Sequence, residues 1–387
     1  MRRVVLTLLA VVLAASLMYG CSSGANQISE EQTEFGRMLG YIPAEYLDEN
    51  DVWFGDLTAF WAIYDPATWP NAEEFLEIPE DERWQMICIS QPLQIASMLH
   101  WYPIQEMKEL AGFDHTGIER LMLVEQPRGE AAVLEGNFDA DIISKKLTGL
   151  GYTEEIYEAT SYYSHGNDYE LDMQHPISAR AMASLNRIYI SQGVLILAPA
   201  TDLLTRILDA MDGIVPSAID TASIRALADS LGEVSFGLLT TPERVVGDVP
   251  TDISSLSRFS VPDTWSDLPD CEMAAFGWHN KGEDWYLDIA LAYTDKPTAT
   301  EAGKEIVRRM QDYELMTWGL APSLETPFKD NFRPGEPAVT GYKEGAAVKI
   351  SCSMVPGSSI WPLRHLLRGY PRDLLFLAPE PAKYIIE

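Results

Sequence analysis

The strand Asp284–Tyr293 most constrains the fold, because apolar side chains alternate along its length. The alternating residues are Trp285, Leu287, Ile289, Leu291 and Tyr293. A shorter apolar run, Met273–Trp278, precedes it across a glycine-containing turn, and an amphipathic helix is predicted over Thr298–Glu314. The local order is therefore strand, strand, helix.

The same order occurs earlier in the chain. Two strands are predicted at Ile118–Glu125 and Ala131–Gly136, and a helix with Ile142 on its apolar side at Asp139–Gly149. Each copy then continues with a second hairpin and a helix. In the first copy the hairpin strands are Arg187–Ile190 and Val194–Ala198; in the second they are Val339–Tyr342 and Ala346–Cys352.

Two such copies predict an α+β fold made of two related halves of antiparallel sheet with helices packed on one face. The first half, with an aromatic-rich lead-in, is expected over residues 34–240 and the second over 271–387. A Pro-, Ser- and Asp-rich segment at 241–270 reads as a loop between them. A groove between paired halves is a common place for a ligand.

Composition supports a folded chain and excludes some partners. The 387 residues are 47% hydrophobic and 10% aromatic, which suffices for a sizeable core. The formal net charge of −30 argues against binding nucleic acid, whose phosphates attract basic surfaces. The sequence suggests no cofactor, because it contains no P-loop, dinucleotide-binding glycine motif or His-Glu-x-x-His helix.

The N-terminus has the pattern of an export signal. Arg2 and Arg3 precede an apolar run from Val4 to Tyr19, which is short for a bilayer span of about 20 residues. Gly20 and Cys21 follow the run, and a Ser- and Gly-containing stretch comes after them.

This stretch resembles the signal of bacterial lipoproteins. The resemblance covers only residues 1–21 and the polar stretch after them; Met18 and Tyr19 depart from the usual residues before the cleavage site. It implies a signal peptide at 1–20, acylation of Cys21, and a lipidated tether at 21–33. The implied location is extracytoplasmic, with the chain anchored to the cell membrane or outer envelope, and the implied partner is the membrane. Several acyl chains on one residue anchor a protein stably.

The other cysteines, Cys88, Cys271 and Cys352, suit buried reduced thiols, which behave as small apolar residues. Outside the cytosol Cys271 and Cys352 could instead form a disulfide.

Two sets of residues are candidates for a site. The first is a metal site in the segment 165–175, where two imidazoles and several carboxylates could ligate a divalent ion; its candidates are His165, Asp168, Asp172 and His175. The alternative is a solvated loop in an acidic chain. The second is a ligand platform of aromatic rings in the lead-in, with Trp53, Trp61, Trp69 and Trp84 as candidates. The alternative is that these rings fill the core.

Three functions follow. The favoured one is a non-catalytic, membrane-anchored lipoprotein that binds a ligand or acts as a scaffold, its small-molecule or protein partner being unknown. The second is an envelope structural protein that binds another protein. The third is a metal-dependent envelope hydrolase that uses the His165–His175 loop.

Overall fold

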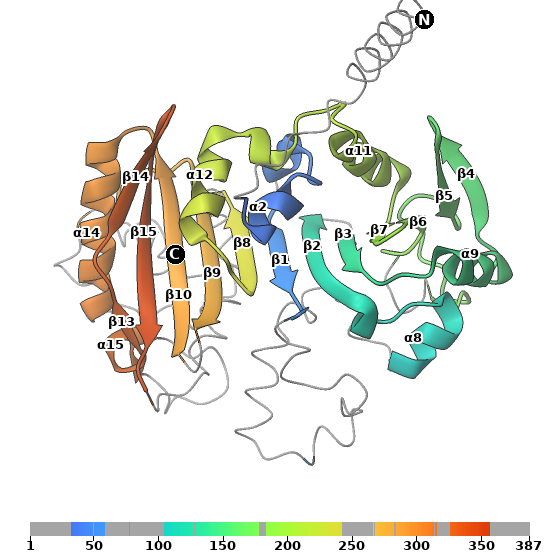
Figure 1. Ribbon diagram of the computed structural model, residues 1–387, viewed down its shortest axis with the longest axis horizontal. Coiled ribbons are helices and arrows are strands. Elements are labelled where there is room, and N and C mark those ends of the chain that lie inside the picture. The colour runs from blue at the N-terminus through green and yellow to red at the C-terminus, as the bar shows by residue number, and fades with distance from the viewer. Residues whose placement is uncertain are drawn as a thin grey trace, which may run out of the picture.

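One large antiparallel sheet organises the chain in the computed structural model, which describes residues 32–48, 50–58, 77, 104–126, 129–177, 183–241, 266, 268–281, 284–312, 314–315 and 326–356. Within these ranges 13 strands pair in the order β13-β15-β10-β9-β8-β1-β2-β3-β7-β6-β5-β4, and β14 also pairs with β15 (Figure 1). The strands are β1 (Val52–Asp56), β2 (Ile118–Gln126), β3 (Gly129–Gly136), β4 (Thr153–Tyr157), β5 (Thr160–Ser164), β6 (Arg187–Ser191), β7 (Val194–Ala198), β8 (Phe236–Thr240), β9 (Met273–Lys281), β10 (Asp284–Tyr293), β13 (Phe332–Pro334), β14 (Ala338–Tyr342) and β15 (Gly345–Met354).

Helices and short strands occupy the connections between these strands. The α-helices are α2 (Glu34–Leu39), α8 (Ile104–Ala111), α9 (Ala140–Gly149), α11 (Thr201–Met211), α12 (Ala222–Leu231), α14 (Lys296–Asp312) and α15 (Phe328–Asn331). Short 3-10 helices are η1 (Ala44–Asp48), η3 (His115–Gly117) and η4 (Ala218–Asp220), and β11 (Glu314–Leu315) pairs with β12 (Thr326–Pro327) apart from the main sheet.

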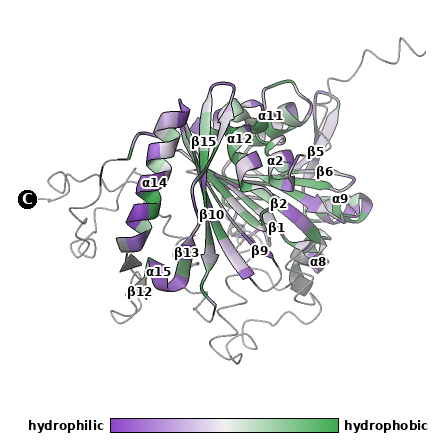
Figure 2. Ribbon diagram, turned by 60° about the vertical axis from the view of Figure 1, so that its left-hand side comes forward, coloured by the Kyte–Doolittle hydropathy of each residue, from purple (hydrophilic) through white to green (hydrophobic). Residues whose placement is uncertain are grey.

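The helices cover both faces of the sheet. Core residues of α8, α9, α14 and α15 belong to one hydrophobic cluster, and those of α2, α11 and α12 belong to a second. The strands supply both clusters: Phe276 and Trp278 of β9 lie in the first, and Met273 and Ala275 in the second. In Figure 2 hydrophobic segments run through the strands, whereas much of α14 is hydrophilic. The expectation that helices pack on one face is therefore wrong, because these strands are apolar on both sides.

The strands predicted from alternation are confirmed, β7 and β10 with the predicted bounds. The first predicted helix is also present as α9, but Ile142, expected on its buried side, is 50% exposed. The strands β1, β4, β5 and β8 were not predicted. Of the predicted loop at 241–270, the structure describes only residues 241, 266 and 268–270.

The two sides of the sheet meet where β1 pairs with β8. The pairing is antiparallel, with Val52 opposite Leu239 and Gly55 opposite Phe236. Figure 1 shows β1 and β8 side by side in the middle, with β2 and β3 to one side and β9 and β10 to the other. The expected two separate sheets facing a groove are thus replaced by one continuous sheet.

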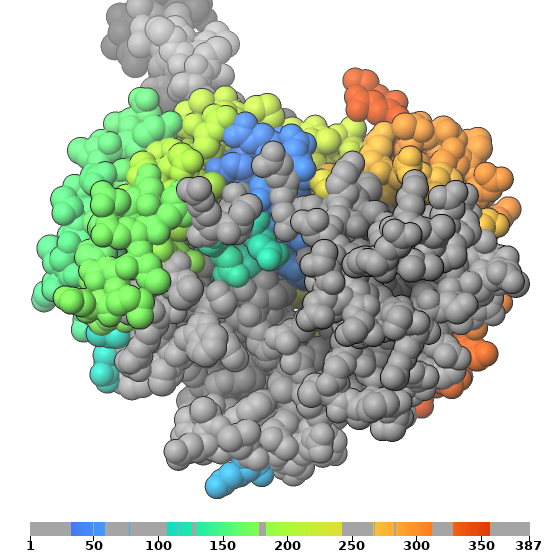
Figure 3. Space-filling view, turned by 180° about the vertical axis from the view of Figure 1, so that it is seen from behind, coloured from blue at the N-terminus to red at the C-terminus, as the bar shows by residue number. Residues whose placement is uncertain are grey.

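The outer strand β4 forms one edge of the sheet and is exposed along four of its five residues. Figure 3 shows the residues of β4 and β5, in green, at one side of the molecule and those of α14, in orange, at the other. Glu154 and Glu155 on β4 place charge along this edge, which disfavours pairing with another chain.

The depth of burial predicts opposite outcomes for two isoleucines in strands. Ile289 of β10 is 0% exposed and Ile156 of β4 is 74% exposed. We expect Ile289→Ala to lower the free energy of unfolding by about 2–5 kcal/mol, because it leaves a cavity in a packed core. The matched control Ile156→Ala should change it by less than about 0.5 kcal/mol. Urea unfolding measures both, and equal effects would contradict the assigned burial.

Candidate functional site

The two histidines of the predicted metal site lie against each other. The segment from His165 to His175 follows β5, and the imidazole rings of these two residues stack with centroids 4.0 Å apart and planes 30° apart. The ring of Tyr152 contacts both, at centroid distances of 5.3 and 5.6 Å. His175 is buried. The sequence was therefore right that these histidines come together.

Their ring nitrogens face different partners rather than one point. Nε2 of His165 lies 3.4 Å from Oδ2 of Asp172, whereas Nε2 of His175 lies 3.1 Å from the carbonyl oxygen of Leu150. Oδ1 of Asp172 accepts a hydrogen bond from the backbone N–H of Gln174 at 2.8 Å. Asp172 thus bonds to its own turn as well as to His165.

Asp168 has a separate structural role at the start of α11. Its Oδ1 accepts hydrogen bonds from the backbone N–H of Thr201 at 2.8 Å and from Oγ1 of Thr201 at 3.0 Å. The same oxygen lies 2.8 Å from Nη2 of the buried Arg187. Arg187 also donates to the carbonyl oxygen of His165 at 3.0 Å. Asp168 and Arg187 therefore fix the loop to the helix terminus.

The predicted metal site is not formed by these four residues. Metal ligands point their lone pairs at one centre, but the two imidazoles stack face to face and Asp168 binds Arg187 and Thr201. In the part of the chain that the structure describes, no group of three or more His, Cys, Asp or Glu side chains is placed to hold a metal ion.

The contact between the two imidazole rings affects how readily His175 takes up a proton. Burial lowers the pKa of His175 below its ordinary value, and the neighbouring His165 lowers it further. The unfolded chain therefore takes up a proton at His175 more readily than the folded chain. The contribution of this group to stability is present above the ordinary histidine pKa of about 6.5 and is lost as the pH falls below it.

We expect the Tm of the protein to fall between pH 7.5 and pH 5.5, and to fall less in His175→Gln, whose amide can still donate to the carbonyl oxygen of Leu150. Thermal unfolding followed by circular dichroism at both pH values measures the difference. An equal loss in the variant and the parent would show that His175 does not control the acid response.

Of the four tryptophans predicted to form an aromatic platform, Trp53 lies within the described residues. This residue is 7% exposed and packs against Phe236, with ring centroids 5.6 Å apart. Its Nε1 donates to Oε2 of Glu125 at 3.4 Å. Trp53 is therefore a core residue rather than part of a surface platform. Trp61, Trp69 and Trp84 lie outside the described residues, as does Cys21.

Cys271 and Cys352 are both buried, and they do not form a disulfide with each other. Cys352 pairs with Leu287 near the start of β10, whereas Cys271 precedes Met273, which pairs with Ala292 near the end of β10. At about 3.4 Å per residue along a strand this separation is far beyond the reach of a disulfide. The alternative of a Cys271–Cys352 bond is therefore wrong, and Cys88 lies outside the described residues.

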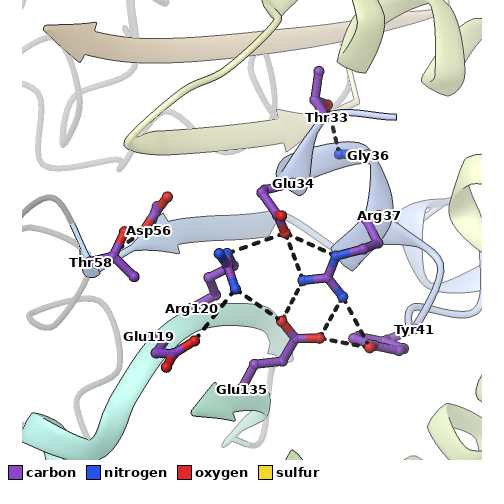
Figure 4. A network of polar contacts seen from close by, with 10 residues as sticks. All are labelled: Thr33, Glu34, Gly36, Arg37, Tyr41, Asp56, Thr58, Glu119, Arg120 and Glu135. Atoms are coloured by element: carbon purple, nitrogen blue, oxygen red, sulfur yellow. Dashed lines mark hydrogen bonds and ion pairs between the residues drawn. The ribbon is translucent and has the colours of Figure 1, made fainter. Parts of the chain in front are cut away.

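A network of five charged side chains, missed by the sequence analysis, fastens α2 to the sheet (Figure 4). Arg37 of α2 makes two hydrogen bonds to Glu135 of β3, one of them at 2.6 Å, and pairs with Glu34 at 2.7 Å. Arg120 of β2 lies 3.2 Å from Glu34 and 3.7 Å from Glu135. Tyr41 donates to Glu135 at 2.7 Å. Arg120 also lies 3.7 Å from the more exposed Glu119, so two arginines meet three carboxylates.

The pKa values in this network move in the directions that its contacts require. Burial alone would raise the pKa of Glu135, but hydrogen bonds from Arg37 and Tyr41 bring it below its ordinary value. Burial, and then the hydrogen bond to Glu135, raise the pKa of Tyr41 to about 12. Glu135 therefore stays ionised at neutral pH, where it holds Arg37.

We expect Glu135→Gln to lower the free energy of unfolding by about 3 kcal/mol, because it leaves the largely buried guanidinium of Arg37 without its main counter-charge. The control is Glu45→Gln, which breaks an exposed pair with Arg206 at 2.8 Å and should cost less than about 1 kcal/mol. Chemical unfolding compares the two. A loss at Glu135 no larger than that at Glu45 would contradict a structural role for the network.

A second polar group, named here the Asp288 cluster, lies on β9, β10 and β15 and comprises His279, Asp288, Lys349 and Ser351. Asp288 is 0% exposed; its Oδ2 lies 2.8 Å from Nζ of Lys349 and its Oδ1 accepts a hydrogen bond from Oγ of Ser351. Nδ1 of His279 lies 3.5 Å from Oδ2 of Asp288. The sequence analysis did not single out these residues. The signal it missed is polar side chains inside strands that are otherwise apolar.

Comparison with known proteins leaves the chain without a family. No family model matches it, and no curated protein matches it. Among solved structures, "Structure of crystal form I of TP0453" and "Structure of crystal form III of TP0453" each align with a TM-score of 0.35 and 7% identity, over 86% of this chain and 97% of that chain. A TM-score of this size carries no argument about fold or function.

Proposed function

We propose that the chain is an extracytoplasmic lipoprotein, anchored to the cell membrane or outer envelope through Cys21, which binds a ligand or acts as a scaffold without catalysis. The observation that carries the proposal is the N-terminal sequence: a basic pair, a short apolar run, and Gly20 before Cys21. In the described part of the chain, no helix has the length and apolar character to cross a membrane.

The position of the folded part is compatible with such an anchor. Helix α2 begins at Glu34, with Oγ1 of Thr33 accepting from the backbone N–H of Gly36 at 3.1 Å. Only the short polar segment 22–33 separates the proposed lipid from this helix. The ionic network of Arg37 and Glu135 joins α2 to β3. The tether would therefore connect to a helix that is fixed on the sheet.

We also propose that the folded part consists of two related halves around the β1·β8 pair. Outward from this pair the order is β2, β3, β7, β6 on one side and β9, β10, β15, β14 on the other. Adding one constant to the residue numbers of the paired residues Val133 and Ile196 gives the paired residues Asp288 and Ser351. The same constant relates the hairpin β2–β3 to β9–β10.

The helices support the same division. After the first hairpin of each half, α9 and α14 both pack in the cluster that contains Trp53. Helix α2 precedes β1 and helix α12 precedes β8, and both helices pack in the opposite cluster. In this division β8 opens the second half, so the boundary falls between α11 and α12 rather than near residue 241. The order of the strands, the register of their pairing and the face on which the helices pack thus support the proposal of two related halves.

Lipidation is tested in cells fed labelled palmitate. We expect the protein to incorporate label, Cys21→Ser to lose it, and the control Cys88→Ser to keep it. Fractionation should place the parent with membranes and Cys21→Ser outside them, because about 0.8 kcal/mol per buried CH₂ makes several acyl chains a stable anchor. Label that persists in Cys21→Ser would overturn the anchor.

A further inference from the structure

The Asp288 cluster contains two buried polar atoms without a hydrogen-bond partner, Nδ1 of His279 and Oδ2 of Asp288. His279 is 9% exposed, yet its Nδ1 makes no hydrogen bond and faces Oδ2 of Asp288 at 3.5 Å. Asp288 in turn is held by the ammonium of Lys349 and the hydroxyl of Ser351. Burial of an ion pair and an unsatisfied imidazole disfavours folding unless the contacts compensate.

The other side of the sheet shows that the fold does not need polar groups here. The constant difference in residue number that relates β2, β3 and β7 to β9, β10 and β15 matches each of the four cluster residues with an aliphatic residue of the first half. These residues are Val124, Val133, Val194 and Ile196. Val133 pairs with Ile196 as Asp288 pairs with Ser351. Val124, Val133 and Ile196 are buried in the core, and Val194 packs against it. The same arrangement of paired strands therefore forms with aliphatic side chains at all four equivalent positions.

The cluster lies where α12 stops covering the sheet. Gly277, beside Asp288 on β9, leaves no room for a Cβ, which would meet Val234 just after α12 at 2.6 Å. Nζ of Lys349 donates to the carbonyl oxygen of Leu231, the last residue of α12, at 3.2 Å. The Lys349 side chain is nonetheless 24% exposed, so the cluster reaches solvent at its lysine.

The surroundings of His279 are cationic. Its ring stacks on Tyr286, with centroids 5.2 Å apart and planes 10° apart, and Nζ of the exposed Lys281 lies 5.6 Å from the centre of the same Tyr286 ring. Burial lowers the pKa of His279, Asp288 opposes the shift, and Lys281 and Lys349 add to it. Asp288 balances Lys349, and Lys281 lies opposite Asp284 in the β9–β10 ladder, so the two lysines supply local positive charge in a chain whose net charge is −30.

We propose that the Asp288 cluster, together with Lys281 and Tyr286, binds the phosphate or carboxylate group of a small ligand. Lys349, Lys281 and a protonated His279 supply the charge for the anion. Asp288 is a positioning residue, which holds the lysine and faces the imidazole that becomes charged. This inference rests on the ligand-binding role proposed above and names its ligand chemistry, but it does not depend on the lipid anchor.

The direct test follows the six histidines of the full chain by NMR of ¹³C-labelled imidazole. Inorganic phosphate is titrated at constant ionic strength, acetate replaces it in a second arm, and chloride in a third. One resonance, assigned through its absence in His279→Gln, should shift saturably with phosphate or acetate and not with chloride. The pKa of His279 should rise when the anion is bound, because a nearby negative charge favours the imidazolium.

Two variants separate binding from folding. Lys281→Ala changes an exposed side chain and should weaken anion binding about tenfold, as expected for one charge-assisted contact. The four changes His279→Val, Asp288→Val, Lys349→Val and Ser351→Ile copy the aliphatic residues of the other side. This variant should unfold at a Tm no lower than the parent, yet show no phosphate or acetate binding by calorimetry.

A His279 resonance that is unmoved by both phosphate and acetate would overturn the proposal, and so would equal affinity in Lys281→Ala. A large fall in Tm in the fourfold variant would assign the cluster to stability and also overturn it. These readouts do not involve palmitate. Failure of the anion site therefore leaves the lipoprotein proposal standing, and failure of acylation leaves the anion site standing.

Discussion

The antiparallel pairing of β1 with β8 is the constraint on which the rest of the structure depends. Through Val52–Leu239 and Gly55–Phe236 it joins strands that are far apart in sequence and makes one sheet of the 13 strands described for it. Both strands are buried almost throughout, so neither of their faces can be left to water. Helices cover the sheet on two sides: α14 packs against β10 and β15 in one hydrophobic cluster, and α12 packs against β9 and β10 in the other.

The Glu135 network and the Asp288 cluster both place charged groups on this largely apolar sheet, and they differ in how those charges are compensated. Around Glu135, two arginines meet three carboxylates, and the main hydrogen bonds run from one helix to one strand. These contacts are accounted for by the attachment of α2 to the sheet. Around Asp288, the ion pair to Lys349 is complete but the buried Nδ1 of His279 is not bonded. Each group holds a buried nitrogen without a hydrogen bond, but Nε of Arg120 lies 3.2 Å from the carboxylate of Glu34, whereas Nδ1 of His279 lies 3.5 Å from that of Asp288.

The local pattern of the sequence was enough to predict most strands but not their assembly. Alternation along Asp284–Tyr293 depends on side chains of the strand itself, and the predicted bounds match β10. Strand β4 was missed because its residues are polar and exposed, so no apolar period marks it. The pairing of β1 with β8 joins distant segments, which no local pattern encodes. The metal prediction failed for the same reason, since proximity in sequence did not reveal that Asp168 turns to Arg187.

The charge of the chain gives the proposed anion site a particular character. A net charge of −30 repels anions at long range, but screening confines that repulsion to about 8 Å at physiological ionic strength. Within that distance of His279 the local groups decide, and Lys281 and Lys349 oppose the effect of Asp288 on the pKa of its imidazole. Recognition would then come from short contacts rather than from electrostatic steering. A ligand selected in this way has to fit the edge of α12 and the ring of Tyr286, so shape as well as charge governs which anion binds.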